Sequence, residues 1–212
     1  MSDHSPAPIE FAARGDAEEV GRAELYGLLS RLWLAPPDAE LLQQFAVAVT
    51  QTPEAGGLLE APWMDLVGAL RATTPEAAAA EHDALFMAIG KPEVFTFASY
   101  YLAGFLNEKP LATLREDLAA LGLTRDAQSL ETEDHIAYVL EVMRYLIAGD
   151  DVAVCNLEQQ RRFFRAHVQP WVGQLCATVQ AHPRARVWAA VAAFTLAFVD
   201  VETQGFDMLE MS

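Results

Sequence analysis

The sequence predicts an all-α fold, a single compact domain of about nine or ten helices, and three observations favour it. Apolar residues recur at three- and four-residue spacing along almost the whole chain. Val, Ile and Thr never alternate with polar residues over the length of a strand. The chain has 212 residues, 52% of them hydrophobic, so roughly 70% of its unfolded surface can be buried around one core.

The chain begins with a segment that has no helical pattern. Residues 1–15 combine acidic residues and prolines without an apolar core flanked by basic residues, so they predict a flexible tail and no secretory signal. Asp16 followed by Glu19 forms a capping-box pattern that opens the first helix. That helix ends before Pro36, because proline cannot continue a helix. The helical domain is therefore expected to cover residues 16–212.

Three further helices are expected before the middle of the chain. Asp38 suits the N-cap of a helix whose apolar positions run to Val49. Pro62 and Pro75 each stand where the first turn of a helix tolerates proline. Residues 88–98 then hold glycine and proline between two helical patterns, so we expect a long ordered loop there and a hinge between two halves of the domain.

The second half of the chain continues with helical patterns. They resume at about Ala98 and at Pro110. Gly122 and Gly149 stand where a glycine commonly ends a helix. Two further long helices and a final one at residues 183–204 complete the predicted set.

Composition excludes several classes of partner. The net charge is −16 and Lys91 and Lys109 are the only lysines, so the chain would repel nucleic acid and favours a basic partner. Residues 187–199 form a strongly apolar stretch without charge, which is shorter than the roughly 20 residues of a membrane span and predicts a buried core helix. Cys155 and Cys176 form no CxxC pair, so both are expected to be reduced thiols of a cytoplasmic protein.

One cluster of ionisable residues precedes an apolar helical face. Glu131, Glu133 and Asp134 place three carboxylates beside His135. Acidic residues in a first turn offset the helix dipole by roughly 0.3 to 1 kcal/mol each, which is a purely structural explanation. The functional alternative is a groove where carboxylates pair with a guanidinium and the imidazole exchanges a hydrogen bond. A third reading, a metal-dependent helical enzyme with Glu131, Asp134 and His135 as ligands, lacks a fourth ligand that the sequence identifies.

Common catalytic and cofactor signatures are missing from the sequence. It contains no GxGxxG, GxxxxGK[ST] or HExxH motif and no EF-hand loop. No histidine has a glutamate three residues before it, which excludes a ferritin-like di-iron site. These absences weaken the enzyme hypothesis, and we expect a protein that is not an enzyme and needs no metal or other cofactor.

Three blocks of sequence occur in an order known from one protein family. The first is EHDALF at residues 81–86, followed by a loop that leads to Ser99 and Tyr101. The second is ETEDHIAYVLEVMRYL at residues 131–146, and the third is FFRAHVQPW at residues 163–171. They resemble the E-Y-x-x-L-F, P-x-x-P-x-x-S-x-Y, E-P-x-D-H and F-x-x-x-H-x-x-P-W motifs of the TorD/DmsD/NarJ family of redox-enzyme maturation chaperones.

Two positions depart from the family pattern. Thr132 stands where the family usually has proline, which predicts a looser connection before Asp134. His82 stands where the family usually has an aromatic residue, so an aromatic contact is in doubt. In the third block we interpret Pro170 as opening a helix and Trp171 as packing beneath it.

The resemblance implies a chaperone that handles another enzyme and turns over no substrate. Members of the family bind the twin-arginine signal peptide of a molybdenum enzyme, or its apo-form, before cofactor insertion and export. The client here is expected to be formate dehydrogenase, another dehydrogenase or an S- or N-oxide reductase. GTP binding is implied for some relatives, although the sequence has no phosphate-cradling loop. A monomer is expected, and a domain-swapped dimer that exchanges halves at residues 88–98 is the alternative.

The same resemblance implies a binding groove for the signal peptide. It would contain Glu131, Asp134 and His135, with Leu85 and Phe86 offering apolar surface. Asp134 is expected to be exposed, so that Asp134→Ala abolishes binding while the fold survives. Leu85 and Phe86 are equally explained as core residues of their helix. A peptide with two arginines and an apolar run requires both carboxylates and an apolar groove.

Overall fold

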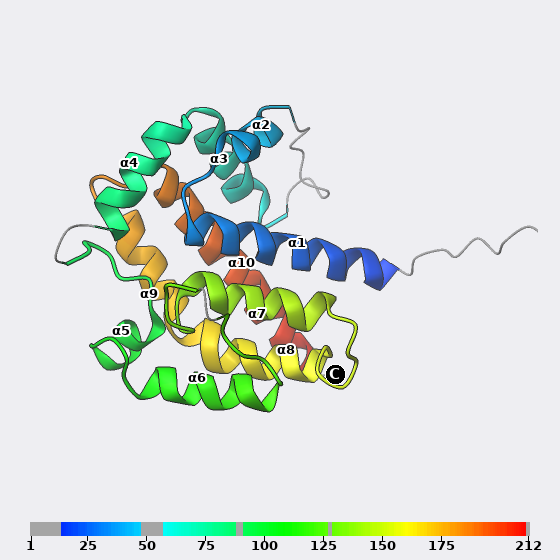
Figure 1. Ribbon diagram of the computed structural model, residues 1–212. Coiled ribbons are helices and arrows are strands. Elements are labelled where there is room, and N and C mark those ends of the chain that lie inside the picture. Colours follow the sequence, from blue (N-terminus) through cyan, green and yellow to red (C-terminus); the bar gives the residue numbers. More distant parts are fainter. Residues whose placement is uncertain (1–13, 48–56, 88–90, 127–128, 211–212) are drawn as a thin grey trace, which may run out of the picture.

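The fold consists of helices joined by short turns and by longer loops (Figure 1). The computed structural model describes residues 14–47, 57–87, 91–126 and 129–210, and within them the chain forms no strand. The expectation of an all-α fold is confirmed. In chain order the helices are α1 (Arg14–Leu34), α2 (Ala39–Val47), α3 (Glu60–Arg71), α4 (Pro75–Phe86), α5 (Ala98–Ala103), α6 (Lys109–Ala120), α7 (Ile136–Ala148), α8 (Leu157–Phe163), the π-helical turn η1 (Phe164–Val168), α9 (Gln169–Gln180) and α10 (Val187–Glu210).

Helices α1 and α10 run through the middle of the molecule and join its two sides (Figure 1). Helix α1 packs along α7, and α10 packs along α9 and α3. Large aromatic side chains fill the centre, where Trp33, Trp171, Trp188, Phe194 and Phe198 are almost fully buried. Each such burial stabilises the fold by roughly 1.5 to 3 kcal/mol. One core therefore connects α2, α3 and α4 with the helices on the other side of α1.

Helix α10 is long and strongly apolar. Among the described residues, Val187–Leu209 is the one segment with the length and mean hydropathy, 1.2, of a membrane span. Half of its most apolar stretch is buried inside the fold. Trp188, Val191, Phe194 and Phe198 recur at helical spacing on the buried face. The prediction of a buried core helix is confirmed.

A buried polar group fixes α10 against α1. Glu202 on α10 accepts hydrogen bonds from Arg22 on α1, at 2.8 Å from Nε and 2.7 Å from Nη2. The hydroxyl of Tyr26 donates to the same carboxylate at 3.0 Å. Burial and the charge of Glu202 raise the pKa of Tyr26 well above its ordinary value, so this phenol remains a donor. A buried carboxylate with these partners sets the axial register of the two helices.

Local signals in the sequence predict several helix ends correctly. Pro75 is the first residue of α4, and the side chain of Thr74 caps that helix by accepting from the N–H of Ala77 at 3.2 Å. Pro62 lies in the first turn of α3. Gly122 follows α6 with φ +72°, the left-handed conformation that glycine adopts without steric cost.

Other helix ends differ from the prediction. Helix α1 begins at Arg14, so Asp16 lies inside the helix and is not its N-cap. The final helix begins at Val187 and not at residue 183. Residues 1–13, which make up most of the predicted tail, and residues 48–56, which include the predicted end of the second helix, lie outside the described part of the chain.

Gly149 ends α7 for a different reason from the one predicted. Its φ is −76°, which any residue adopts, so the left-handed conformation is not what requires glycine. A Cβ atom at this position would lie 2.5 Å from Sγ of Cys155 and 2.8 Å from the carbonyl oxygen of Tyr145. Glycine is needed because the chain passes close to its own preceding turn.

Candidate functional site

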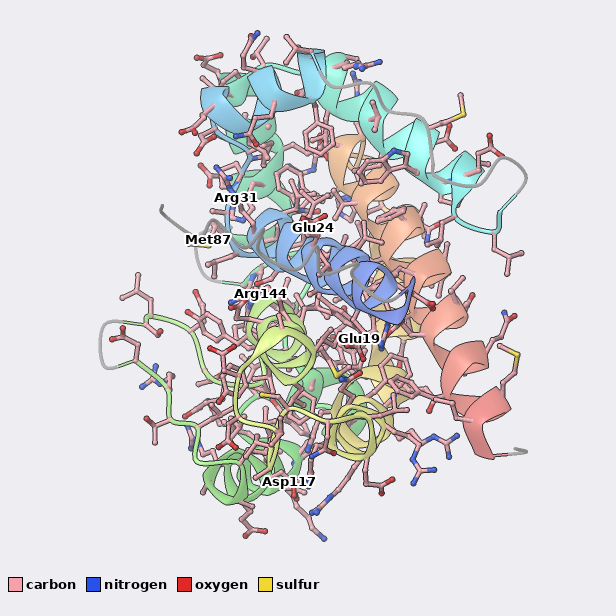
Figure 2. The ribbon with its side chains drawn as sticks, turned by 90° about the vertical axis from the view of Figure 1, so that its right-hand side faces the viewer. Glu19, Glu24, Arg31, Met87, Asp117 and Arg144 are labelled. Carbon is pink, nitrogen blue, oxygen red and sulfur yellow. The ribbon has the colours of Figure 1, made fainter. Side chains whose placement is uncertain are left out.

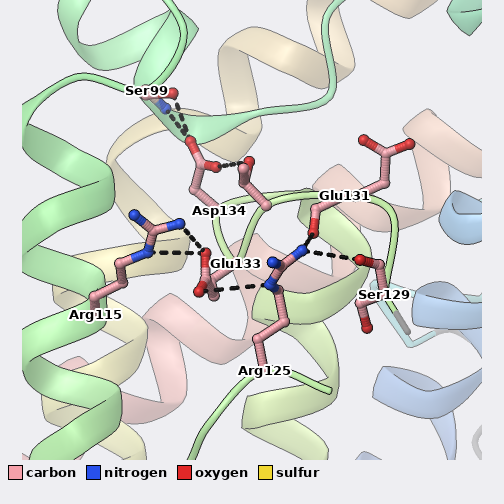
Figure 3. Close-up of polar contacts among 8 residues, drawn as sticks. Ser99, Arg115, Arg125, Ser129, Glu131, Glu133 and Asp134 are labelled. Carbon is pink, nitrogen blue, oxygen red and sulfur yellow. Dashed lines mark hydrogen bonds and ion pairs between the residues drawn. The ribbon is translucent and has the colours of Figure 1, made fainter. Parts of the chain in front are cut away.

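The predicted site lies in the connection that precedes α7, which we call the acidic segment (residues 129–135). Its Asp134 is completely buried. The carboxylate accepts from the N–H and the hydroxyl of Ser99, at 3.0 and 2.5 Å, and from the hydroxyl of Thr132 at 2.6 Å (Figure 3). The expectation that Asp134 is exposed is therefore wrong. Its three hydrogen bonds join the start of α7 to the start of α5.

Backbone hydrogen bonds reinforce this junction. The N–H of Ala98 donates to the carbonyl of Asp134, and the N–H of Ile136 donates to the carbonyl of Thr96, both at 2.9 Å. Phe97 and His135 form the isolated antiparallel bridge between the two connections. Within the predicted hinge, residues 88–90 lie outside the described residues, whereas the end of that segment is fixed to the acidic segment. The hinge itself stays a prediction.

His135 is the N-cap of α7 and is almost fully buried. Its Nδ1 accepts from the N–H of Ala137 at 3.2 Å, which requires the neutral ring to carry its proton on Nε2. Burial lowers the pKa of His135 to about 4, and the nearby His82 acts in the same direction against the opposing charge of Asp134. The imidazole is therefore a neutral capping group at physiological pH.

The buried histidine predicts a loss of stability in weak acid. An unfolded imidazole has a pKa of about 6.5, so below that pH the unfolded chain binds a proton that the folded chain excludes. The free energy of unfolding should fall from pH 6.5 towards pH 4, by at most about 1.4 kcal/mol per pH unit for this group. Urea denaturation at several pH values measures it. His135→Asn keeps a capping oxygen without titrating, so its free energy of unfolding should fall less steeply with falling pH than that of the wild type. Equal slopes for the two proteins would contradict the role of His135 in this loss.

The two glutamates of the acidic segment differ in their surroundings. Glu133 is held by Arg115, whose Nε and Nη2 donate at 3.0 and 2.8 Å, and by Arg125 at 3.7 Å (Figure 3). Burial alone would raise the pKa of the Glu133 carboxyl, but the hydrogen bond from Arg115 and the charges of both arginines lower it below its ordinary value. Glu131 is half-buried, and its side chain points away from these arginines (Figure 3).

The geometry does not favour the metal-dependent enzyme. The carboxylate of Asp134 is already occupied by hydroxyl and N–H donors, and one ring nitrogen of His135 caps α7. Glu131 points away from Asp134 (Figure 3). Within the described residues, no group of three His, Cys, Asp or Glu side chains could hold a metal ion.

The predicted apolar residues of α4 are mostly internal. Leu85 is fully buried in the core, so the expectation that it offers surface to a ligand is wrong. Phe86 is half-buried, and its ring lies 6.0 Å from that of Trp33 and 5.8 Å from that of Trp188. The ring of His82 lies 5.3 Å from both Phe86 and Trp188. The ring of His82 therefore makes the aromatic contact that the sequence left in doubt.

The first residue of the same motif has a role that the sequence did not reveal. The carboxylate of Glu81 accepts from the N–H groups of Arg186, Val187 and Trp188, at 2.7, 3.2 and 2.9 Å. It thus caps the amino terminus of α10 from another helix. The only signal in the sequence is indirect, since residues 183–186 contain no serine, threonine, aspartate or asparagine to serve as an N-cap.

The third block has the structural role that was predicted. Pro170 lies in the first turn of α9, and Trp171 is buried beneath that helix. The Nε1–H of Trp171 donates to the carbonyl of His167 at 2.7 Å. The ring of Tyr101 stacks on Trp171 with centroids 5.7 Å apart, so the first and third family blocks are in contact.

Two cavities border the acidic segment, and sequence reasoning missed both. The first, of about 360 Å³, includes Leu114 of α6 and Val139 of α7 in its walls and reaches Asp134. The second, of about 310 Å³, includes Leu118 of α6, Val142 of α7 and the carboxylate of Glu133. Both volumes are within the range of about 300 to 1,000 Å³ typical of ligand sites. Leu114 and Leu118 are four residues apart on α6, and Val139 and Val142 are three apart on α7. The two cavities are therefore separated by about one helical turn along these helices.

Exposed apolar side chains continue from the first cavity, and we call them the apolar rim: Leu102, Phe105 and Leu106. Leu102 also lines the cavity, and the other two follow it in the turn between α5 and α6. Phe105 is 72% exposed, although burying a phenylalanine is favourable by about 1.5 to 3 kcal/mol. Adjacent exposed apolar residues beside a cavity are typical of a surface that binds a partner.

Comparison with known proteins agrees with the motifs. The family described as "Nitrate reductase delta subunit" matches residues 53–177, more than half of the chain. A protein named chaperone protein TorD from Aliivibrio fischeri is 26% identical over 201 residues, which cover 86% of this chain and 93% of that protein. Chaperone protein TorD from Vibrio cholerae is 27% identical over 138 residues, covering 62% and 63% of the two chains.

The fold also matches a solved structure. A protein from Archaeoglobus fulgidus, described as a redox enzyme maturation protein, superimposes with a TM-score of 0.59 at 18% sequence identity. The match covers 92% of this chain and 99% of that one, so the two proteins share the fold over most of the chain. With the family match over residues 53–177, the chain belongs to the nitrate reductase delta subunit family, that is, to the TorD/NarJ family of redox-enzyme maturation chaperones.

Proposed function

We propose that the chain is a cytoplasmic chaperone for the maturation of one molybdenum-containing redox enzyme, formate dehydrogenase or an oxide reductase. It binds the twin-arginine signal peptide of that client, the apo-form, or both, before the cofactor is inserted and the client is exported. Family membership supports the general role. The more specific role is supported by the two cavities that border the acidic segment, one lined by several acidic residues and one beside the apolar rim.

The two cavities fit the two parts of such a peptide. Asp126, Glu133 and Glu141 are among the residues that line the second cavity, and carboxylates form strong paired hydrogen bonds with guanidinium groups. The first cavity and the apolar rim suit the hydrophobic run that follows the arginines. The net charge of −16 attracts a basic peptide over longer distances. A peptide lying along α6 and α7 would reach both cavities.

The five residues first expected at the site divide into two groups within this proposal. Glu131 and Phe86 are half-buried and can contact the peptide directly. Asp134, His135 and Leu85 are buried, so they act by holding the acidic segment and α4 in place. The residues of the apolar rim provide the apolar surface that Leu85, being buried, cannot offer to the peptide.

Titration with signal peptides tests the function. A twin-arginine peptide should bind with micromolar affinity or better, and its Lys-Lys variant should bind at least about tenfold more weakly, because an ammonium cannot form bidentate hydrogen bonds. Both affinities should fall between low and physiological salt. Isothermal titration calorimetry measures them. Absence of binding to either peptide would contradict signal-peptide recognition and leave the apo-form as the client surface.

A matched pair of variants in the same titration tests the apolar rim. Phe105→Asp should weaken binding of the twin-arginine peptide by about tenfold, the loss of about 1.4 kcal/mol of apolar contact. Met64→Asp introduces the same charge at a comparably exposed methionine of α3, away from the two cavities. The two variants should differ, and equal affinities would mean that Phe105 makes no apolar contact with the peptide.

A further inference from the structure

The acidic segment presents three acceptors to one guanidinium, and the chain fills them with its own Arg125. The Nη1 of Arg125 donates to the carbonyl oxygens of Ser129 and Glu131, at 2.9 and 3.0 Å. Its Nε lies 3.7 Å from Oε1 of Glu133 (Figure 3). Two carbonyls and a carboxylate around one planar group match the donor geometry of arginine. We call this arrangement the guanidinium receptor.

Arg115 approaches the same glutamate from a different side. Its Nε and Nη2 both donate to Oε2 of Glu133, whereas Arg125 faces Oε1. Arg115 belongs to α6 and holds the carboxylate in position. Arg125 belongs to the connection after α6, outside any helix, and a third of its side chain is exposed. Removing Arg125 from the receptor would therefore leave Oε1 directed at a site that a second guanidinium could enter.

The receptor opens into the second cavity. Arg125, Ser129 and Glu133 are part of the wall of this space of about 310 Å³. Tyr138 and Val142 of α7 provide apolar wall against which the methylene groups of an arginine can pack. Leu130 lies between Ser129 and Glu131, whose carbonyls accept from Arg125, and is 94% exposed at the edge of the receptor. An entering arginine would thus meet acceptors, aliphatic packing and an exposed leucine together.

We propose that the guanidinium receptor binds an arginine of the client's signal peptide, and that Arg125 occupies the receptor until this arginine displaces it. The proposal rests on the proposed function and assigns one of its contacts. Exchanging one guanidinium for another leaves the charge of the site unchanged, so no new buried charge has to be desolvated. Arg125 then lowers the affinity of the free chaperone and keeps Glu133 paired when no client is bound.

The receptor also accounts for a preference for arginine over lysine. Its acceptors lie on different sides of a planar group that carries five N–H donors. An ammonium is a compact, strongly hydrated charge and cannot reach the two carbonyls and the carboxylate with the same geometry. Selection at this point would act on the guanidinium itself and not on positive charge alone.

Removing Arg125 tests the exchange. Arg125→Ala should bind the twin-arginine peptide about five- to tenfold more tightly than Arg31→Ala does. Arg31 pairs with Asp38 on the exposed surface, and Figure 2 shows it far from Asp117 of α6, so Arg31→Ala makes the same change in net charge away from the receptor. The Lys-Lys peptide should gain no more from Arg125→Ala than from Arg31→Ala. Adding Glu133→Gln to Arg125→Ala should remove the gain.

A second measurement does not depend on peptide binding. Methylguanidinium at tens of millimolar should raise the melting temperature of Arg125→Ala, because it refills the receptor, and should not raise that of the wild-type chain or Arg31→Ala. If the wild type bound the twin-arginine peptide and the two variants bound it with equal affinity, the inference would be overturned and the proposed function would stand. Failure of every variant to bind the twin-arginine peptide would overturn both.

Discussion

Asp134→Ala should lower the free energy of unfolding by about 3 to 5 kcal/mol. The buried carboxylate accepts two hydrogen bonds from Ser99 and one from Thr132, and bonds to a charged group are worth about 1.5 to 3 kcal/mol each without being additive. Alanine leaves those donors buried and unpaired and opens a gap between the starts of α5 and α7. For a chain of this length the melting temperature should fall by about 10 °C. Urea and thermal denaturation measure both quantities.

Two milder substitutions separate this explanation from a role in ligand contact. Asp134→Asn keeps an oxygen for Ser99 and can donate its amide to the hydroxyl of Thr132, so it should cost clearly less than alanine. Ser99→Ala removes one donor and leaves the rest of the junction, so it should also cost less. If Asp134→Ala melted like the wild type and lost only peptide binding, the buried junction would be the wrong explanation.

For Asp134 the sequence predicts the position along the helix but not the burial of the side chain. The sequence correctly places it at the start of a helix, because capping residues and apolar spacing are local signals. Its exposure depends on Ser99, which is 35 residues away and becomes a neighbour only after folding. The same carboxylate could cap a helix at the surface or join two helices inside, and nothing within a helical turn of it distinguishes these outcomes.

Apolar residues show the same limit. Leu85 and Leu102 both lie on helical patterns, yet one is fully buried and the other lines the first cavity at the surface. Periodicity identifies the face of a helix but not whether another element covers it. Leu85 is enclosed by the packed core, whereas the described residues leave Leu102 of α5 exposed. The apolar rim could not have been separated from the core before the packing was known.

The cap on α10 predicts the second large loss of stability. Glu81→Ala should lower the free energy of unfolding by about 2 to 3 kcal/mol, because it removes an N-cap worth about 0.5 to 2 kcal/mol and a favourable charge at the helix dipole. Three N–H groups, those of Arg186, Val187 and Trp188, lose their acceptor. The affected helix is the central one of the core, so the loss should appear in global unfolding measured with urea.

Neighbouring substitutions make this prediction specific. Glu81→Gln keeps one acceptor oxygen without the charge and should lose about half as much. Asp83→Ala changes an exposed carboxylate on the same helix, and it should stay within about 0.5 kcal/mol of the wild type. Amide exchange at Val187 and Trp188 should accelerate in Glu81→Ala before exchange elsewhere in α10. A loss no larger than that of Asp83→Ala would mean that α10 is held by its apolar packing alone. The family glutamate would then need an explanation outside the fold.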